Sequence, residues 1–435
     1  MRMALKLPKI PKLPKLPGRG QKSRAAKVAA DPYIVSLDIG TEYVKALIGE
    51  VKGSHVEIIG AARAHQRLTD MANGAVTDIA GVVENCDKAL REAEAMAGVV
   101  ARNTVIGIAG ELVKGMSTTV SYRRARPEVQ IDMVELKDII ERVQRTAFEK
   151  VRDQLAWETG SEDVQVKLVN AAVVDVEIDG YRVTNPVGFQ GRDVSIAVFT
   201  AFAPMVHLGA LQSVARDLDL NLINIAAEPF AVAKSVGADD STEFSAIFID
   251  IGGGTSDIAV VNNGGVVGTK MFAIGGRSFT KRIGQSLSVS FEEAEELKLH
   301  HSAGKLNKAQ EKEVAEALAR DVDVWLSGVE LSLSEFDELD HLPNRILLCG
   351  GGSALPEIKE ALLTAGWYKD LPFARKPKID FVAPADVNRV IDHTGRLTSP
   401  QDITPMGLAN LALDIVGSEP AGEQILQRLS RTLSI

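Results

Sequence analysis

The chain has 435 residues, of which 45% are hydrophobic and 25% charged, a balance typical of a globular protein with more than one folding unit. Its formal charge is −9, but residues 1–30 contain nine Lys or Arg and no acid, so the rest of the chain carries −18. That acidic body argues against broad nucleic-acid binding, and no uncharged apolar run reaches the roughly 18 residues that span a bilayer. With only Cys86 and Cys349, the sequence excludes a disulfide framework and predicts buried thiols in a reducing compartment.

The basic N-terminal tail contains a three-residue repeat, LPKIPKLPKLP, at residues 7–17. Proline at every third position favours polyproline II and blocks an α-helix, which places the aliphatic residues on one stripe and the lysines on another. The repeat lacks the continuous apolar segment of a secretory signal. Two interpretations stay open: a solvated, disordered leader, or a peripheral contact with anionic lipid or a proline-recognising partner.

The body opens with three predicted strands, at residues 34–39, 43–51 and 55–61. A helix follows, capped by Thr77 or Asp78 and closed by Gly98. Its predicted apolar face contains Ile79, Val83, Cys86, Leu90 and Ala93. Residues 104–109 then predict a short buried strand, so the chain starts as an α/β unit.

A block of about 90 residues with a different pattern comes next, as expected for a small domain of its own. It contains a predicted helix at 132–151 and predicted strands at 164–177 and 193–200. Two further helices are predicted after this block, at 205–218 and 227–235.

The opening pattern recurs in the second half of the chain. Strands are predicted at 246–251, 257–261, 265–272 and 345–349, with helices at 279–287, 291–301 and 308–335 between the third and the fourth. A helix follows the last of these strands, and residues 404–413 predict a short final helix. The body therefore consists of two halves, each of which begins with a hairpin around the sequence Asp-Ile-Gly.

The two Asp-Ile-Gly turns carry the residues that predict a phosphate site. Glycine allows positive φ and close approach of the backbone to a ligand, and successive N–H groups in such a turn bind anions. Gly40 and Thr41 form one such turn, and Gly252, Gly253, Gly254 and Thr255 form the other. Asp38 and Asp250 end the preceding strands, where a carboxylate can hold hydrated Mg²⁺ against phosphates, and Asp257 could join the metal's outer shell. The alternative for a single such hairpin is a simple tight turn.

A third glycine cluster, Gly350 to Gly352 with Ser353, follows a buried strand and opens a helix, which also favours an anion or a nucleotide.

Five segments in order resemble the actin/hexokinase/heat-shock-chaperone ATPase superfamily. LDIGTEYVKALIGEV resembles its first phosphate motif, FIDIGGGTSDIAVV its second, and ILLCGGGSALPEIKEAL its adenosine motif. NIAAEPFAVAKSVG and TPMGLANLAL resemble its two connecting helices. The resemblance implies an α/β, actin/ribonuclease-H-like two-domain ATPase fold that binds ATP and Mg²⁺.

Within that superfamily the chain most resembles the bacterial cell division protein family FtsA. RVTNPVGFQGRDV and EELKLHHSAG resemble FtsA segments, and the extra block lies where FtsA carries its 1C subdomain. The predicted boundaries are 31–109, 204–240 and 403–417 for domain 1A, 110–203 for the inserted 1C-like subdomain, 241–275 and 344–402 for domain 2A, 276–343 for subdomain 2B, and 1–30 and 418–435 for the two tails.

The resemblance also implies roles for individual residues. Asp38 and Asp250 would flank the Mg²⁺-nucleotide, and the glycines and threonines of the two turns would hold its phosphates. Glu295 and Lys298 would face the ribose and adenine, with Gly351, Gly352 and Ser353 beneath the base. Glu228 is a candidate for orienting the water that attacks ATP in slow, Mg²⁺-dependent hydrolysis. The alternatives are an exposed helical ion pair for Glu295 and Lys298, and a helix N-terminal acid stabilised by the macrodipole for Glu228.

FtsA-like proteins form filaments on the inner face of the cytoplasmic membrane and anchor FtsZ filaments there, usually through a C-terminal amphipathic helix. Residues 423–435 put Ile425, Leu426, Leu429 and Leu433 on one face, as in an interfacial helix, although the segment is short and has no aromatic residue. A frayed tail is the alternative. Because one weak anchor gives marginal binding, the basic N-terminal tail is expected to supply a second membrane contact.

Two rivals differ in function. A PilM-like cytoplasmic scaffold of type IV pilus assembly has the same fold, but usually a less glycine-rich second phosphate motif and no C-terminal amphipathic helix. A sugar kinase would need a catalytic base in a separate substrate pocket, and the sequence offers none. A chaperone is disfavoured because no substrate-binding domain follows residue 417.

Overall fold

The computed structural model describes residues 32–160, 164–237, 244–364 and 366–416. The two predicted tails, 1–30 and 418–435, lie outside these residues. Within the described residues, no helix combines the length and the apolar character needed to cross a bilayer.

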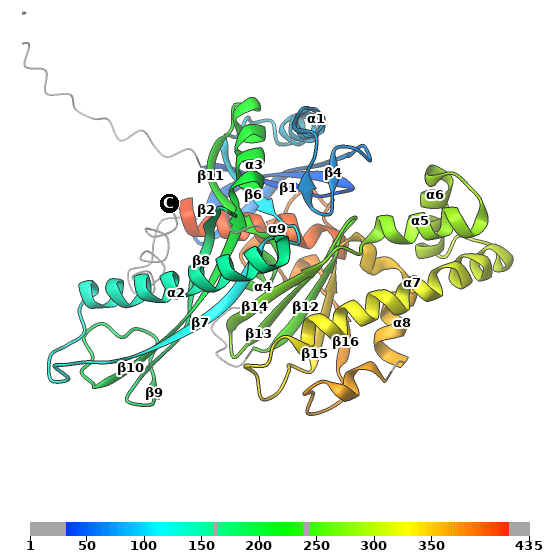
Figure 1. Cartoon of the computed structure of the whole chain (residues 1–435). Coiled ribbons are helices and arrows are strands. Elements are labelled where there is room, and N and C mark those ends of the chain that lie inside the picture. The colour runs from blue at the N-terminus through cyan, green and yellow to red at the C-terminus, as the bar shows by residue number, and fades with distance from the viewer. Residues whose placement is uncertain (1–31, 161–163, 238–243, 365, 417–435) are drawn as a thin grey trace, which may run out of the picture. The chain divides into compact units, whose positions relative to one another are not determined.

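A six-stranded sheet forms the core of the first half (Figure 1). Its strands, in spatial order, are β11 (Asn221–Ala227), β6 (Asn103–Ile108), β1 (Tyr33–Ile39), β2 (Tyr43–Lys52), β3 (His55–His65) and β17 (Val390–Asp392). β1 pairs antiparallel with β2 and parallel with β6, which in turn pairs parallel with β11. Nearly every residue of β1 is buried, as expected for a strand whose two faces are both covered.

Helices α1 (Ile79–Ala97) and α9 (Ile403–Val416) pack against this sheet. Asp78 caps α1, because its side chain accepts a hydrogen bond from the amide of Ala80, and Gly98 ends the helix in the left-handed region at φ 70°. The predicted cap and end of this helix are therefore confirmed. The predicted apolar face was partly wrong, because Ile79 is 38% exposed while Val82 is fully buried.

A nine-stranded sheet forms the core of the second half and continues into the inserted block. Its order is β16 (Lys378–Phe381), β15 (Arg345–Cys349), β12 (Ala246–Ile251), β13 (Ser256–Asn262), β14 (Gly265–Phe272), β7 (Lys114–Arg123), β10 (Asp193–Pro204), β8 (Val166–Ile178) and β9 (Tyr181–Arg182). The run β14-β13-β12-β15-β16 repeats the order and the pairing senses of β3-β2-β1-β6-β11. The predicted repeat of the opening pattern is therefore a repeat of topology.

The inserted block pairs its strand β7 with β14 of the second half, although it follows β6 of the first half in the sequence. Its helix α2 (Met133–Thr159) packs along β7 and β10 (Figure 1). The block has apolar clusters of its own, one of which joins Leu136 and Ile140 of α2 to Ile196 of β10. Strands β7 and β11 were not predicted from the sequence.

The remaining elements connect and cover the sheets. The helices are α3 (Met205–Asp217), α4 (Glu228–Ser235), α5 (Gly276–Leu287), α6 (Phe291–Ser302), α7 (Lys308–Ser334) and α8 (Pro356–Thr364). The short elements are β4 (Met71–Ala72), β5 (Ala75–Val76), and the 3-10 turns η1 (Gly351–Ala354), η2 (Trp367–Asp370), η3 (Pro384–Asp386) and η4 (Pro400–Asp402). Along β12, Phe248 joins the cluster that contains β1, whereas Ile247 and Ile249 join the cluster under α7, so alternate residues serve different cores.

Candidate functional site

A cavity of about 230 Å³ brings most of the predicted site residues together. Those that line it are Asp38, Gly40, Thr41, Glu228, Asp250, Gly252, Gly253, Thr255, Asp257, Glu295, Lys298, Gly351 and Gly352. They come from β1, β12 and β13 with their turns, from α4 and α6, and from η1. Gly254 and Ser353 are the two predicted site residues that do not line the cavity.

The two glycine-rich turns lie directly against each other at this cavity. A Cβ added to Gly253 would lie 2.7 Å from the Cβ of Glu42, and one added to Gly254 would lie 2.8 Å from Thr41 Oγ1. Gly254 therefore contributes by allowing contact between the turns. The structure corrects one expectation, because neither Gly40 nor Gly252, Gly253 or Gly254 has positive φ. Close approach, rather than backbone handedness, excludes a side chain at Gly253 and Gly254.

Asp38 and Asp250 end the two central strands and have different partners. Asp38 is 3% exposed, and its Oδ2 accepts a hydrogen bond from Lys45 Nζ at 2.9 Å. The hydroxyl of Thr404, at the start of α9, donates to Asp250 Oδ2. Lys45 and Thr404 were not predicted as site residues. Hairpin register could have found Lys45, since the strands on either side of the first turn pair Asp38 with Lys45.

Burial and mutual repulsion raise the pKa of three carboxyl groups that line the cavity, those of Asp257, Glu228 and Asp250. Burial, together with the charge of Asp250, raises the pKa of Asp257 to about 8, against the opposing hydrogen bond from Thr255. Burial and the charges of Asp38, Asp257 and Asp250 raise the pKa of Glu228 well above its ordinary value. Burial also raises the pKa of Asp250.

Lys45 opposes part of this negative charge. Burial alone would lower the pKa of Lys45, but the charges of Asp38, Asp250 and Glu228 outweigh it and raise the pKa. The cavity is lined by six carboxyl groups and two lysines, Lys45 and Lys298, and this excess of acids favours a further cation.

The donor set fits a hydrated cation better than a directly caged one. Within the described residues, no group of three or more His, Cys, Asp or Glu side chains is arranged to hold a metal ion. Asp257 Oδ1 is nevertheless buried and has no hydrogen-bond partner. Mg²⁺ keeps several of its waters when it binds beside phosphates, so Asp38, Asp250 and Asp257 could hold it through water. Their assignment as metal residues remains a prediction.

Glu228 is the first residue of α4 and faces the cavity. A Cβ added to Gly107 of β6 would lie 2.6 Å from Glu228 Oε1, so glycine at that position leaves room for the carboxylate. Glu228 thus lies in the first turn of a helix, as in the alternative of an acid stabilised by the helix macrodipole, and it also lines the cavity.

Glu295 and Lys298 form an ion pair on α6, in which Lys298 is buried and Glu295 is partly buried. Lys298 Nζ donates to Glu295 Oε2 at 2.6 Å, to Thr280 Oγ1 at 2.8 Å and to the carbonyl of Gly276 at 3.2 Å. Lys298 is 8% exposed, so the alternative of an exposed helical ion pair is wrong. A capping box between Ser290 and Glu293 fixes where α6 begins, and therefore where along the helix the pair lies. Contact with ribose and adenine remains a prediction.

The third glycine cluster forms a short 3-10 turn, η1, before α8. Gly350 has φ 80°, and a Cβ there would lie 2.1 Å from Asp250 Oδ1, so glycine is required at this position. Ser353 is 1% exposed, and its hydroxyl donates to the carbonyl of Gly350 at 2.7 Å. Ser353 therefore stabilises the turn from behind, while Gly351 and Gly352 line the cavity.

Glu42, beside the first turn, and Arg277 on α5 form a further pair, which was not predicted from the sequence. Their side chains form an ion pair between the first hairpin and α5. Nothing in the local sequence around either residue signals this pairing.

Comparisons with known proteins support the predicted family and fold. Residues 247–401 match the family model described as cell division protein FtsA. The chain is 26% identical to cell division protein FtsA of Pseudomonas aeruginosa over 382 residues, which cover 82% of this chain and 87% of that protein. It is 26% identical to cell division protein FtsA of Neisseria meningitidis over 414 residues, which cover 90% and 92% of the two chains.

Among solved structures, a chain of the PilM-PilN type IV pilus biogenesis complex superposes with a TM-score of 0.63 and 18% identity, covering 89% of this chain and 99% of that one. The predicted resemblance to the FtsA family and the predicted actin-like two-domain fold are therefore confirmed.

Proposed function

From its place among FtsA-like actin homologues, we propose that this chain binds ATP in the cavity between its two glycine-rich turns and acts in bacterial cell division. In this role it forms filaments at the inner face of the cytoplasmic membrane and anchors an FtsZ-like filament protein there. The observation that carries the nucleotide proposal is the direct contact of the two turns, Gly253 against Glu42 and Gly254 against Thr41, at one cavity lined by buried carboxylates.

The two turns would hold the phosphates from opposite sides. Backbone N–H groups and the hydroxyls of Thr41 and Thr255 supply donors, and both threonines line the cavity. Mg²⁺, when bound, would neutralise phosphate charge. Asp38 and Asp250 would hold its water ligands, and Lys45 would orient Asp38 through their 2.9 Å contact.

Glu228 would orient the water that attacks the terminal phosphate. Burial and the neighbouring carboxylates raise the pKa of Glu228, which disfavours the ionised form that accepts a proton. A cation nearby favours ionisation of a carboxyl group, so binding of the magnesium nucleotide would prepare Glu228 for this role. Slow turnover would couple closure of the cavity to the state of the filament.

Membrane attachment is assigned to the C-terminal segment 418–435, with the basic residues 1–30 as a second contact. One weak membrane anchor gives only marginal binding, whereas two weak anchors together give stable attachment. No role in binding nucleic acid is proposed, because the body is acidic.

The test is sedimentation of the full chain with liposomes that contain anionic lipid, with and without Mg-ATP, and with FtsZ added. We expect nucleotide-dependent pelleting that brings FtsZ into the pellet. Deletion of residues 2–30 is expected to weaken the pelleting, and unchanged pelleting would remove the N-terminal tail from the proposal. Failure of ATP to bind in a filter or fluorescence assay would overturn the assignment of the cavity.

A PilM-like scaffold of pilus assembly is the second candidate, because a PilM-PilN complex shares the fold over 89% of this chain. That similarity shows the fold alone, while the sequence relatives above are FtsA proteins. Binding to the cytoplasmic tail of a pilus membrane protein, with no recruitment of FtsZ, would favour this candidate.

A further inference from the structure

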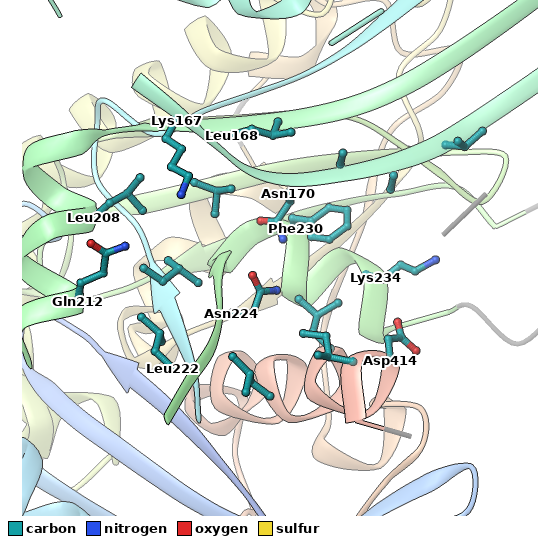
Figure 2. Close-up of a pocket in the computed structure, with 18 residues that line it drawn as sticks. Lys167, Leu168, Asn170, Leu208, Gln212, Leu222, Asn224, Phe230, Lys234 and Asp414 are labelled. Atoms are coloured by element: carbon teal, nitrogen blue, oxygen red, sulfur yellow. The ribbon is translucent and has the colours of Figure 1, made fainter. Parts of the chain in front are cut away.

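A second cavity, of about 390 Å³, lies between strands β8 and β11 and shares no lining residue with the predicted nucleotide cavity. Figure 2 shows apolar side chains around it, among them Leu208 of α3, Leu222 of β11 and Phe230 of α4. Lys167 of β8 and Lys234 of α4 lie at separate places on its rim (Figure 2). The cavity therefore combines an apolar floor with two cations.

Two strand edges flank this cavity. β11 is an edge strand, because it pairs with β6 and has no strand partner on its other side within the described residues. β8 pairs with β10 along its length, but β9 meets it only at Glu177 and Ile178, so in the described part of the chain the end of β8 beside the cavity is open on one side. Open edges of this kind can accept backbone hydrogen bonds from an added segment.

The charges on the rim specify what kind of segment would fit. Among the described residues, neither Lys167 nor Lys234 forms an ion pair, whereas the nearby Asp414 is paired with Arg389 at 2.7 Å. A complementary segment would therefore present acidic groups to the lysines and aliphatic side chains to the floor.

The chain itself supplies such a segment at the rim. Leu411, Asp414 and Ile415, in the last part of α9, line the cavity, and α9 ends at Val416. Residues 417–424 contain two glycines, a proline and the acids Glu419 and Glu423, and precede the aliphatic residues of 425–433. Eight residues can extend about 26 Å, which is enough for the chain to turn back.

We propose that residues 417–435 dock into this cavity of their own chain, with Ile425, Leu426 and Leu429 on the apolar floor and Glu419 and Glu423 facing Lys167 and Lys234. Docked in this way, the aliphatic face of the segment is withheld from a lipid surface. The cavity and the membrane then compete for one segment. Only this competition rests on the proposed function, since docking itself requires no membrane.

Amide hydrogen exchange without lipid tests the docking. We expect β8 and β11 to exchange about tenfold more slowly in the full chain than in a chain ending at Val416, as for a segment docked nine-tenths of the time. In the full chain, Leu426→Glu with Leu429→Glu should abolish the protection, whereas the matched pair Ser430→Glu with Ser434→Glu should keep it. These substitutions lie outside the described residues, so they change no described contact of the body. Equal exchange in the full and shortened chains would overturn the proposal.

A charge exchange tests the geometry. Lys167→Glu with Lys234→Glu should remove the protection, and adding Glu419→Lys with Glu423→Lys should restore it. Absence of restoration would contradict the assigned facing of the two lysines.

Liposome pelleting of the same variants separates the docking from the membrane role. Lys167→Glu with Lys234→Glu leaves the aliphatic face intact, so pelleting should rise several-fold. Protection of the unmodified chain with no pelleting of any variant would keep the docking and refute the membrane role. Pelleting of the unmodified chain with no protection of β8 and β11 would keep the membrane role and refute the docking, and protection that appears only when a second protein is added would assign the cavity to that partner.

Discussion

Arg277 Nε donates to Glu42 Oε2 at 2.6 Å, and both side chains are only 14% exposed. The same guanidinium donates to the carbonyl of Met71 at 3.1 Å, so one side chain of α5 holds two segments of the first half. Glu42 also lines the predicted nucleotide cavity and contacts the position of Gly253. The pair is thus placed to keep the two turns together around a bound nucleotide.

Arg277→Ala is expected to speed the release of nucleotide about tenfold, because a partly buried pair of this kind contributes on the order of 1–2 kcal/mol to closure. Glu42 would keep His65 as a partner at 2.7 Å, so the loss should be partial. Stopped-flow displacement of a fluorescent ATP analogue measures the rate. Lys281→Ala, an exposed position on the same helix, is the control and should leave the rate unchanged. A release rate that Arg277→Ala leaves unaltered would remove the pair from nucleotide retention.

Gly253→Ala and Gly351→Ala form a matched pair of substitutions in the same cavity. Alanine at Gly253 would place its Cβ 2.7 Å from that of Glu42, so we expect a loss of about 1–3 kcal/mol of unfolding free energy from overpacking. Alanine at Gly351 meets no protein atom within 4 Å and should leave the melting temperature unchanged. If Gly351 lies beneath the base, however, its substitution should still weaken ATP binding. Equal stability of the two variants would contradict the close contact of the turns.

Regular periodicity and end signals allowed much of the fold to be predicted from the sequence. The capping side chain of Asp78 and the left-handed Gly98 are local features, and so α1 was placed to within a residue or two. The hairpin β12–β13 and the buried strand β15 follow from short apolar runs beside glycine. By contrast, β7 has no apolar run and is held by long-range pairing with β10 and β14, which local sequence does not encode.

The candidate site divides in the same way. Glycines and acids next to strand ends were recognisable, because their local sequence is unusual. Thr404 lies 154 positions from Asp250, and Arg277 lies 235 positions from Glu42, so only the folded chain brings each pair together. The family resemblance predicted Ser353 beneath the adenine base. In the structure its hydroxyl instead donates to the carbonyl of Gly350 in the same turn.

The raised pKa of Asp257 predicts that the free energy of unfolding falls as the pH rises. Its pKa is raised from 3.8 to about 8 in the folded chain, so between these values the folded state binds more protons than the unfolded state, and unfolding free energy decreases with pH. Asp250 and Glu228 have pKa values shifted in the same direction and add to the slope. Urea unfolding at several pH values, in the presence of a metal chelator, measures this dependence of the unfolding free energy on pH.

Asp257→Asn should flatten the decrease and stabilise the chain near pH 8 by up to about 6 kcal/mol, since the pKa of Asp257 is raised by about four units and each unit corresponds to about 1.4 kcal/mol. The control is Asp340→Asn, an exposed acid, which should follow the unmodified chain. Addition of Mg-ATP should reduce the slope of the unmodified chain, because opposite charge favours the ionised carboxylates. A slope that Asp257→Asn does not change would assign the pH effect to other groups.

Lys298→Met separates packing from charge at the predicted nucleoside end of the cavity. Methionine keeps the apolar stem but removes three hydrogen bonds and leaves the carboxylate of Glu295 without its 2.6 Å partner. We expect unfolding free energy to fall by about 1–3 kcal/mol and ATP affinity to fall as well. Lys305→Met, at an exposed position just after α6, should change neither quantity.

Adding Glu295→Gln to Lys298→Met removes the unpaired charge, so stability should largely recover while ATP affinity stays low. Chemical unfolding and equilibrium titration with a fluorescent ATP analogue give the two quantities on the same samples. Recovery of both quantities in the double variant would show that the pair acts only by holding α6 against the start of α5, where Lys298 already donates to Gly276. Recovery of stability alone would place the pair in contact with the nucleoside.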